Sequence, residues 1–167
     1  MDIQISLEGL TEITGMLTNY PEIAAKHLQV AMQKSTLLLQ REIAEAVPTG
    51  AHQLLRKSIF SEVHVSETGF LGVVGTSSPY ALAVELGTKP HFPPIAPLID
   101  WVIAKLGVEA KQAPSVAYLV ARKISKKGTV GQFYFANTVA KQTPTVQRYF
   151  TEAREAIMDE MIQQGKA

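Results

Sequence analysis

The sequence predicts an α+β fold, in which a small antiparallel β-sheet packs against a long N-terminal helix and a long C-terminal helix. Apolar residues recur at helical spacing over residues 21–47 and again after residue 144. Between them, residues 59–66 alternate in the way of a half-buried strand, and a turn and a second apolar run follow. No repeat or linker divides the 167 residues, so we expect one domain covering residues 1–167.

The first element expected is a short strand over residues 2–6, followed by a helix over residues 7–18. Pro21 suits the first turn of a second helix that runs to about Val47, and residues 48–50 (Pro-Thr-Gly) end it. The buried stripe of this second helix is expected at Leu28, Met32, Ser35, Leu39, Ile43 and Ala46.

The middle of the chain predicts a β-hairpin. Residues 51–58 have a mixed pattern, residues 59–66 form the first strand, and residues 70–74 form the second strand after a turn. Residues 80–86 are too short for periodicity to decide, but a glycine directly after them favours a short helix.

Three helices are expected in the last part of the chain. Residues 98–106 follow Pro97, and residues 114–127 begin with a proline; each run ends at a glycine. The apolar and aromatic run 133–139 is interpreted as partly strand. For the last helix, Thr143 is the expected N-cap and Pro144 the first helical residue. Its stripe comprises Val146, Phe150, Ala153, Ile157 and Met161.

The most informative segment is residues 74–88, together with the loop that follows it. Gly75 and Gly87 are interpreted as the two corners of a small rigid unit, because glycine adopts positive φ without steric cost. We assign this structural motif to Gly75, Thr76, Tyr80, Glu85, Gly87 and Thr88. Prolines at 90, 93, 94 and 97 then hold the backbone extended, so this loop is expected on a surface.

The composition limits the possible partners. Sixteen basic residues face fifteen acidic ones, which gives no electrostatic reason to expect nucleic acid or an anionic membrane. The absence of cysteine excludes disulfides and thiolate catalysis. The N-terminal residues do not resemble a signal peptide, and no apolar run approaches the ~20 residues that span a bilayer. We therefore expect a protein made in a cytoplasm, with no membrane partner.

No sequence motif indicates catalysis, so we expect no enzyme activity, no catalytic residue, no metal and no cofactor. The four histidines lack the spacing of a His-Glu-x-x-His site, and no Gly-x-Ser-x-Gly motif is present. Glu85 lies among apolar residues and needs a partner if it is buried. It is interpreted as a structural carboxylate bonded to backbone N–H groups or to an arginine, rather than as a general base.

Basic residues Arg122, Lys123, Lys126 and Lys127 end one of the expected helices. Cations are stabilising at a helix C-terminus, and this reading is favoured over a nucleic-acid contact in a nearly neutral chain. The aromatic residues at 133–135 are expected in the core or at an interface, because no basic residues alternate with them as on an RNA-binding sheet.

An ordered set of short motifs resembles the tail-component proteins of long-tailed bacteriophages, the neck or tail-completion subunits that help to join head to tail. The motifs span roughly residues 20–162. They are Pro48-Thr49-Gly50, Leu55-x-x-Ser58-Ile59, Val74-Gly75-Thr76, Tyr80-Ala81, Val84-Glu85-x-Gly87-Thr88, Pro93-Pro94-x-x-Pro97-Leu98-x-x-Trp101-Val102, Ala121-Arg122-Lys123-Ile124-x-x-Lys127-Gly128-Thr129 and residues 133–136. The spacing from Gly50 to Leu55 is longer than in the family, so a contact made there can differ.

The resemblance implies a virion structural protein without catalysis, which assembles as a homo-oligomeric ring, a hexamer or dodecamer, in the neck or tail. It implies partners among other head–tail connector or tail proteins, nucleic acid at most passing through the ring lumen, and the host cytoplasm as the place of assembly. The proline loop is the expected subunit interface, with candidates Lys89, Pro90, His91, Phe92, Pro93 and Pro94. Two alternatives stay open: a nucleic-acid-binding accessory protein that uses residues 122–127, and a hydrolase if a histidine or metal lies beside Glu85.

Overall fold

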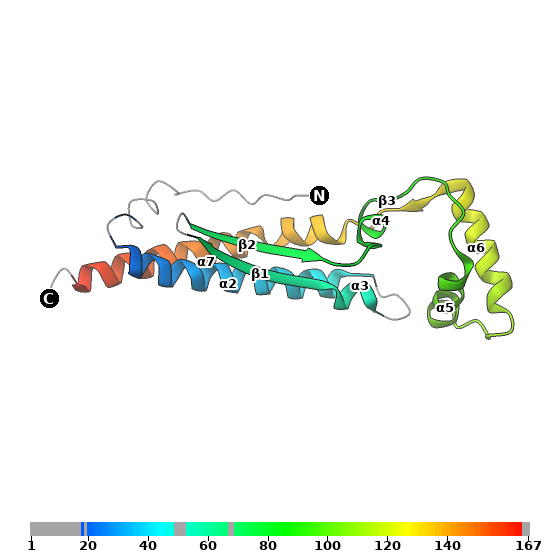
Figure 1. Cartoon of the computed structure of the whole chain (residues 1–167), viewed down its shortest axis with the longest axis horizontal. Helices are drawn as coiled ribbons and strands as arrows, with labels where there is room; N and C mark the ends of the chain where they lie inside the picture. Colours follow the sequence, from blue (N-terminus) through cyan, green and yellow to red (C-terminus); the bar gives the residue numbers. More distant parts are fainter. Residues whose placement is uncertain (1–17, 19, 49–52, 67–68, 165–167) are drawn as a thin grey trace. The chain divides into compact units, whose positions relative to one another are not determined.

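The computed structural model describes residue 18 and residues 20–48, 53–66 and 69–164 (Figure 1). Along the chain its elements are α2 (Pro21–Ala46), α3 (Leu54–Lys57), β1 (Ile59–Ser66), β2 (Gly69–Thr76), α4 (Ala81–Leu86), β3 (Gly87–Thr88), α5 (Ile95–Leu106), α6 (Ala113–Lys127), β4 (Thr129–Val130) and α7 (Tyr134–Gln164). The expected α+β class is confirmed. The predicted strand at 2–6 and nearly all of the predicted helix at 7–18 lie outside the described residues.

The contacts within the chain divide it into two compact units. Unit 1 holds Met1–Glu42, Phe60–Gly75 and Ala136–Ala167. Unit 2 holds Ile43–Ile59 and Thr76–Phe135. Each unit is therefore assembled from separate stretches of the sequence, and α7 begins in unit 2 and continues in unit 1.

In unit 1, α2 and α7 lie side by side and antiparallel (Figure 1). Near the start of α2, Lys26 contacts Glu160. Near its end, Glu42 accepts a hydrogen bond from Gln142 at 2.9 Å. One helix therefore advances while the other returns. The side chains that become buried are Ile23, Ala24, Leu28, Ala31, Ser35 and Leu39 of α2, and Val139, Val146, Phe150, Ala153 and Ile157 of α7. Most of these residues are three, four or seven positions apart, which is the stripe of a helix that buries one face.

The β1–β2 hairpin packs on α2. Ser61 of β1 donates a hydrogen bond to the Gln40 side chain at 2.7 Å. At Gly72 of β2, an added Cβ would lie only 2.6 Å from the Met32 sulfur and 2.7 Å from a Thr36 methyl carbon. The strand therefore approaches the helix so closely that glycine is needed at this position. β1 agrees with the predicted strand, and β2 is longer than predicted.

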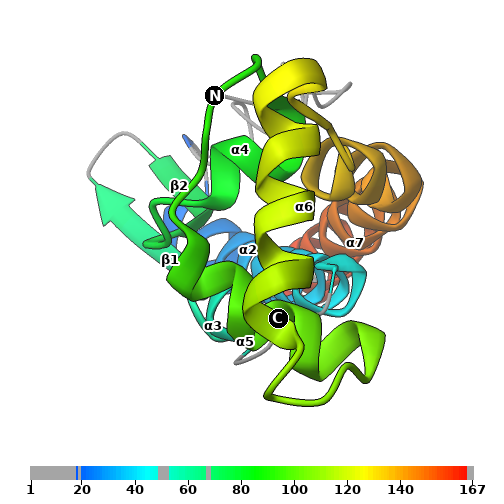
Figure 2. The ribbon, with the colours of Figure 1, turned by 90° about the vertical axis from the view of Figure 1, so that its right-hand side faces the viewer.

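In unit 2, α5 packs against α6 (Figure 2). Their shared core is built on Val102, Ala113 and Ala117, which are fully buried. The small alanines of α6 allow the two helices to approach closely, and Gly107 in the left-handed region (φ 64) ends α5. α5 begins at Ile95, three residues before the predicted start, so Pro97 lies in its first turn, where proline is tolerated.

A second antiparallel pair, which was not predicted, joins α4 to the start of α7. Gly87 pairs with Val130, and Thr88 pairs with Thr129. Next to this pair, the N–H of Gln132 donates to the Val84 carbonyl at 2.9 Å. A pair of two-residue strands carries no periodicity that a sequence pattern can reveal. The short helix α3 was also missed, because its four residues are all at least partly exposed.

The predicted start of the last helix is wrong. α7 begins at Tyr134, so residues 134–139 of the apolar run are helix rather than strand, and Pro144 lies inside the helix. Thr143 does not cap a helix; its hydroxyl donates to the Val139 carbonyl one turn earlier at 2.8 Å. Buried residues lie on both sides of Pro144 in α7, Val139 at 7% exposure and Val146 at 3%, two helical turns apart. Packing of these residues offsets the local cost of the proline.

Candidate functional site

The predicted interface loop, residues 89–94, joins β3 to α5 and has no regular structure. Its residues are exposed, except for Pro93, which is half-buried. The His91 ring nitrogen Nδ1 lies 3.0 Å from the Lys89 carbonyl oxygen, which fixes the imidazole against its own loop. The prolines and this contact restrict the backbone while the side chains stay available to a partner.

Phe92 lies against α6. Its ring centroid is 6.1 Å from that of Tyr118, and the two planes are tilted by 56°. In spite of this contact, 53% of Phe92 and 50% of Tyr118 remain exposed. The loop and α6 therefore present one aromatic surface, in which the two rings contact each other and half of each stays exposed.

Large apolar side chains are exposed over most elements of unit 2. Val130 of β4 is 84% exposed, and Leu119, next to Tyr118 on α6, is 60% exposed. Others in this unit include Leu82 and Leu86 of α4, Trp101, Ile103 and Leu106 of α5, and Phe133 just before α7. Exposed apolar residues that occur singly need no explanation, but a concentration on adjacent elements marks an interaction surface.

Unit 2 also carries an excess of basic residues. Of the chain's 16 basic and 15 acidic residues, unit 2 holds nine basic and four acidic ones. The basic ones are Arg56, Lys57, Lys89, Lys105, Lys111, Arg122, Lys123, Lys126 and Lys127; the acidic ones are Glu45, Glu85, Asp100 and Glu109. Arg122, Lys123, Lys126 and Lys127 are exposed at the end of α6, next to its aromatic part. The near-neutral total therefore conceals a local positive surface.

Glu85 is buried and holds the start of α7. Its carboxylate oxygen Oε2 accepts the backbone N–H of Phe135, the second residue of α7, at 2.8 Å. Its backbone carbonyl accepts the N–H of Phe133 at 3.0 Å. A carboxylate at a helix N-terminus satisfies a backbone donor and interacts favourably with the helix dipole. This is the structural bonding expected for Glu85 from the sequence.

Tyr134, the first residue of α7, is buried beside this carboxylate. Burial and, second, the charge of Glu85 raise the pKa of the Tyr134 hydroxyl above its ordinary value of 10.0. Both causes disfavour the phenolate, so the folded chain keeps this tyrosine protonated.

Gly87 and Thr88 form the strand β3. Gly87 has φ 76, and an added Cβ would collide with the Thr129 carbonyl of β4. Thr88 and Thr129 are joined by a contact of 3.0 Å between their hydroxyl oxygens. This corner of the motif is therefore present as the sequence predicts, and its close pairing with β4 adds a second reason for glycine.

The other predicted corner is wrong, because Gly75 lies inside β2 and has no positive φ. Its missing side chain instead gives room to the Phe60 ring, which would be 3.0 Å from an added Cβ. The hydroxyl of the next residue, Thr76, lies 2.6 Å from that of Ser58 and accepts the N–H of Ser78. Tyr80 precedes α4 and is 63% exposed. The motif residues therefore lie at the end of β2, before and within α4, and in β3.

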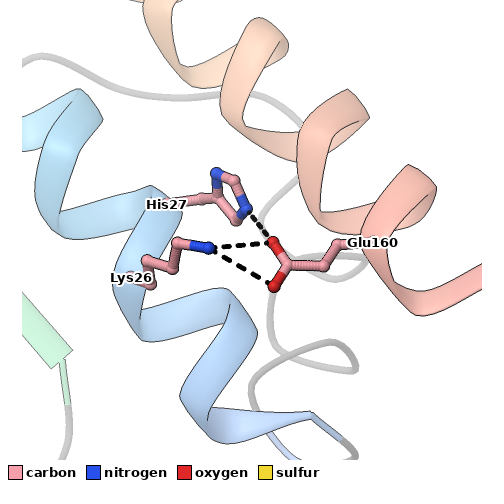
Figure 3. A network of polar contacts seen from close by, with 3 residues as sticks. All are labelled: Lys26, His27 and Glu160. Atoms are coloured by element: carbon pink, nitrogen blue, oxygen red, sulfur yellow. Dashed lines mark hydrogen bonds and ion pairs between the residues drawn. The ribbon is translucent and has the colours of Figure 1, made fainter. Parts of the chain in front are cut away.

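One polar cluster in unit 1 was not singled out from the sequence (Figure 3). Glu160 of α7 receives the Lys26 ammonium at 3.2 Å and lies 2.7 Å from His27 Nε2. Hydrogen bonds from His27 and then Lys26 lower the pKa of the Glu160 carboxyl below its ordinary value of 4.5. These residues are more than 130 positions apart, so no local spacing reveals the cluster.

Among the described residues, no group of three or more histidines, aspartates and glutamates is placed to hold a metal ion. None of the helices in the described ranges has the length and apolar character needed to cross a bilayer. Comparison with protein-family models, with curated proteins and with solved structures finds no match for this chain. The surface of loop 89–94 and α6 is the candidate site that the geometry offers.

Proposed function

We propose that this chain is a virion structural protein of a long-tailed phage or prophage. It acts as a tail-completion or head–tail joining (neck) subunit and assembles as a homo-oligomeric ring between head and tail. The ordered motifs that resemble the phage tail-component family support this proposal. The observation that carries it is the loop surface of unit 2, where Phe92 rests on Tyr118 and half of each ring stays exposed.

A ring needs two different patches on each subunit, one for each neighbour. The loop 89–94 suits one of these patches because its backbone is already restricted, so little conformational entropy is lost on docking. Aromatic side chains are the usual anchors of such contacts. Phe92 is the expected anchor, and Lys89 and His91 lie at its rim.

Negative-stain electron microscopy and light scattering of the purified chain test the proposal. We expect rings with a central hole for the wild type, and their loss in Phe92→Asp. The matched control is Leu54→Asp, which places the same charge on a residue of unit 2 that is 64% exposed on α3. Particles of unchanged size in Phe92→Asp would remove the loop from the interface, and turnover of a substrate by the purified chain would contradict a purely structural role.

The exposed cations at the end of α6 favour a second candidate, a nucleic-acid-binding accessory protein. Titration of the chain with duplex DNA at two salt concentrations distinguishes the two. If Arg122, Lys123 and Lys126 each neutralise a phosphate, log K falls against log salt with a slope of about −3. For a ring subunit we expect no such binding by the isolated chain.

A further inference from the structure

The exposed face of α6 matches, in charge and in apolar character, an exposed face of α7 in the same chain. On α6, Tyr118, Leu119, Arg122, Lys123 and Lys126 are all exposed. Their steps of one, three and four residues place them on one side of the helix, opposite the buried alanines Ala113, Ala117 and Ala121. Along the helix this face is first apolar and then basic, and the structure pairs none of its three cations with a carboxylate among the residues that it describes.

The second half of α7 has an exposed face of the opposite charge. Glu152, Glu155, Met158, Asp159 and Ile162 recur at steps of three and four residues, and all are exposed. Along α7 this face is acidic at Glu152 and Glu155, mixed at Met158 and Asp159, and apolar at Ile162. Glu152 is held by Arg148 at 3.5 Å, but the described chain gives neither Glu155 nor Asp159 a cationic partner.

The two faces match when the helices run antiparallel. At ~1.5 Å per residue, the mean positions of the apolar and basic residues of the α6 face are roughly 8 Å apart, and those of the apolar and acidic residues of the α7 face are roughly 7 Å apart. In this arrangement Tyr118 and Leu119 meet Met158 and Ile162, while the basic residues of α6 meet Glu155 and Asp159. Side-chain length covers the remaining difference in spacing.

We propose that the α6 face of one copy docks on the α7 face of a second copy of this chain, next to the Phe92 loop. This inference rests on the proposed ring function. It names the surface on the neighbouring copy that the α6 face contacts, and the relative direction of the two helices. The contact is heterologous, because a patch of unit 2 meets a different patch of unit 1, and such contacts build rings or filaments. Charge complementarity sets the orientation, and the apolar pairs provide the burial.

The test uses two charge-reversed variants. The first is Arg122→Glu with Lys126→Glu, and the second is Glu155→Lys with Asp159→Lys. Each variant alone places like charges at the contact, so we expect self-association to weaken at least about tenfold. An equimolar mixture should assemble again, because each contact between the two variants is once more of opposite sign.

The control for folding and for the net charge of the first variant is Arg56→Glu with Lys57→Glu, the same charge change on the exposed pair of α3. It should associate like the wild type. Far-UV circular dichroism and urea midpoints show whether each variant is folded. Wild-type assembly should weaken with added salt, because charges at a partly exposed contact are screened.

Introduced thiols locate the contact independently of ring formation. The chain has no cysteine, so Leu119→Cys in one copy and Met158→Cys in another are the only thiols in a mixture. A bismaleimide should give crosslinked dimers in the mixture, and Leu54→Cys in place of Leu119→Cys should not.

The outcomes separate the two proposals. Rings that persist in both charge-reversed variants would overturn the helix docking and leave the ring function standing. A wild-type chain that stays monomeric at low salt and gives no crosslink would contradict both. A crosslink within one chain carrying both thiols, or loss of DNA binding without loss of assembly in the first variant, would assign the α6 face to another occupant.

Discussion

Glu85 joins two parts of the chain that lie 50 residues apart, by accepting the N–H of Phe135. Glu85→Ala removes this acceptor and leaves a backbone donor at the start of α7 without it. We expect a loss of about 0.5–2 kcal/mol in the free energy of unfolding, as for other helix caps. Urea denaturation measures this change.

Glu85→Gln is the matched control, since it keeps an oxygen acceptor and removes the charge. We expect Glu85→Gln to lose less stability than Glu85→Ala. Its loss should equal the favourable interaction of the carboxylate with the helix dipole, ~0.3–1 kcal/mol. Equal stability of all three proteins would show that the bond to Phe135 contributes nothing to folding.

Tyr134 makes folding sensitive to alkaline pH. Its pKa is raised in the folded chain above the ordinary value of 10.0, so the folded state binds the proton more tightly than the unfolded state. The resulting stabilisation is fully present below pH 10 and is lost as the pH rises through the folded pKa. We therefore expect wild type to lose stability relative to Tyr134→Phe above pH 10, measured by urea midpoints at several pH values. Parallel pH curves for the two proteins would contradict the assignment.

Glu160 has the opposite effect at acidic pH. Its folded pKa is lowered below 4.5 by His27 and Lys26, so it stabilises the chain above that pH, and this contribution disappears as the pH falls through the folded pKa. Glu160→Gln should be less stable than wild type at neutral pH and should approach it in acid. Glu109→Gln removes an exposed carboxylate between α5 and α6 and is the control for net charge. If Glu109→Gln gave the same pH curve as Glu160→Gln, the cluster would have no specific role.

The role of a single residue was predictable only where its neighbours in the sequence determine that role. Glu85 was identified because a glutamate among apolar neighbours requires a partner, but that partner lies on α7 and leaves no local signal. Gly87 was identified as a corner because glycine adopts positive φ without steric cost, and the same glycine favoured a short helix before it. Gly75 was misassigned because a glycine that admits a neighbouring ring looks the same in the sequence as one that turns the chain.

At the scale of elements, α7 tests whether packing or local signals set a helix boundary. Pro144 cannot donate to the Ala140 carbonyl, and Ala140 is exposed, so water can reach that group. Pro144→Ala restores the missing bond and should stabilise the chain by roughly 1–2 kcal/mol, below the ~3 kcal/mol that proline costs inside a helix. If the helix began at Pro144 instead, the substitution would be neutral or destabilising in urea.

The elements that the sequence predicts well are those with a long period. α2 has a stripe of many turns, and its bounds agree with the prediction to within one residue. The start of α7 was missed because Thr143 and Pro144 have the pattern of a helix N-terminus. The apolar stripe that overrides this pattern stabilises the helix only by packing on α2, and the local sequence does not show that contact. β3 and β4 were missed because each has two residues, and their pairing depends on close backbone approaches at Gly87, Gly128 and Gly131 rather than on their own pattern.

At the scale of the whole molecule, the proposed self-association would link stability to concentration. If copies associate only when folded, the melting temperature rises with protein concentration by mass action. We expect this rise for the wild type and not for Phe92→Asp, measured by differential scanning fluorimetry over a hundredfold concentration range. Leu54→Asp, on the exposed face of α3, should behave like the wild type. A melting temperature that is independent of concentration in all three would argue against a ring of folded subunits.

The interleaving of the two units sets an order of events during synthesis. All of unit 2 has been made once residue 135 has been added, but the apolar stripe of α2 must await α7, whose last turns come more than a hundred residues later. At ~5–20 residues per second, this stripe stays without its partner helix for roughly 6–24 s on the ribosome. The nascent chain therefore exposes the apolar face of α2 for most of its translation. Exposed apolar surface of this kind is what chaperones bind.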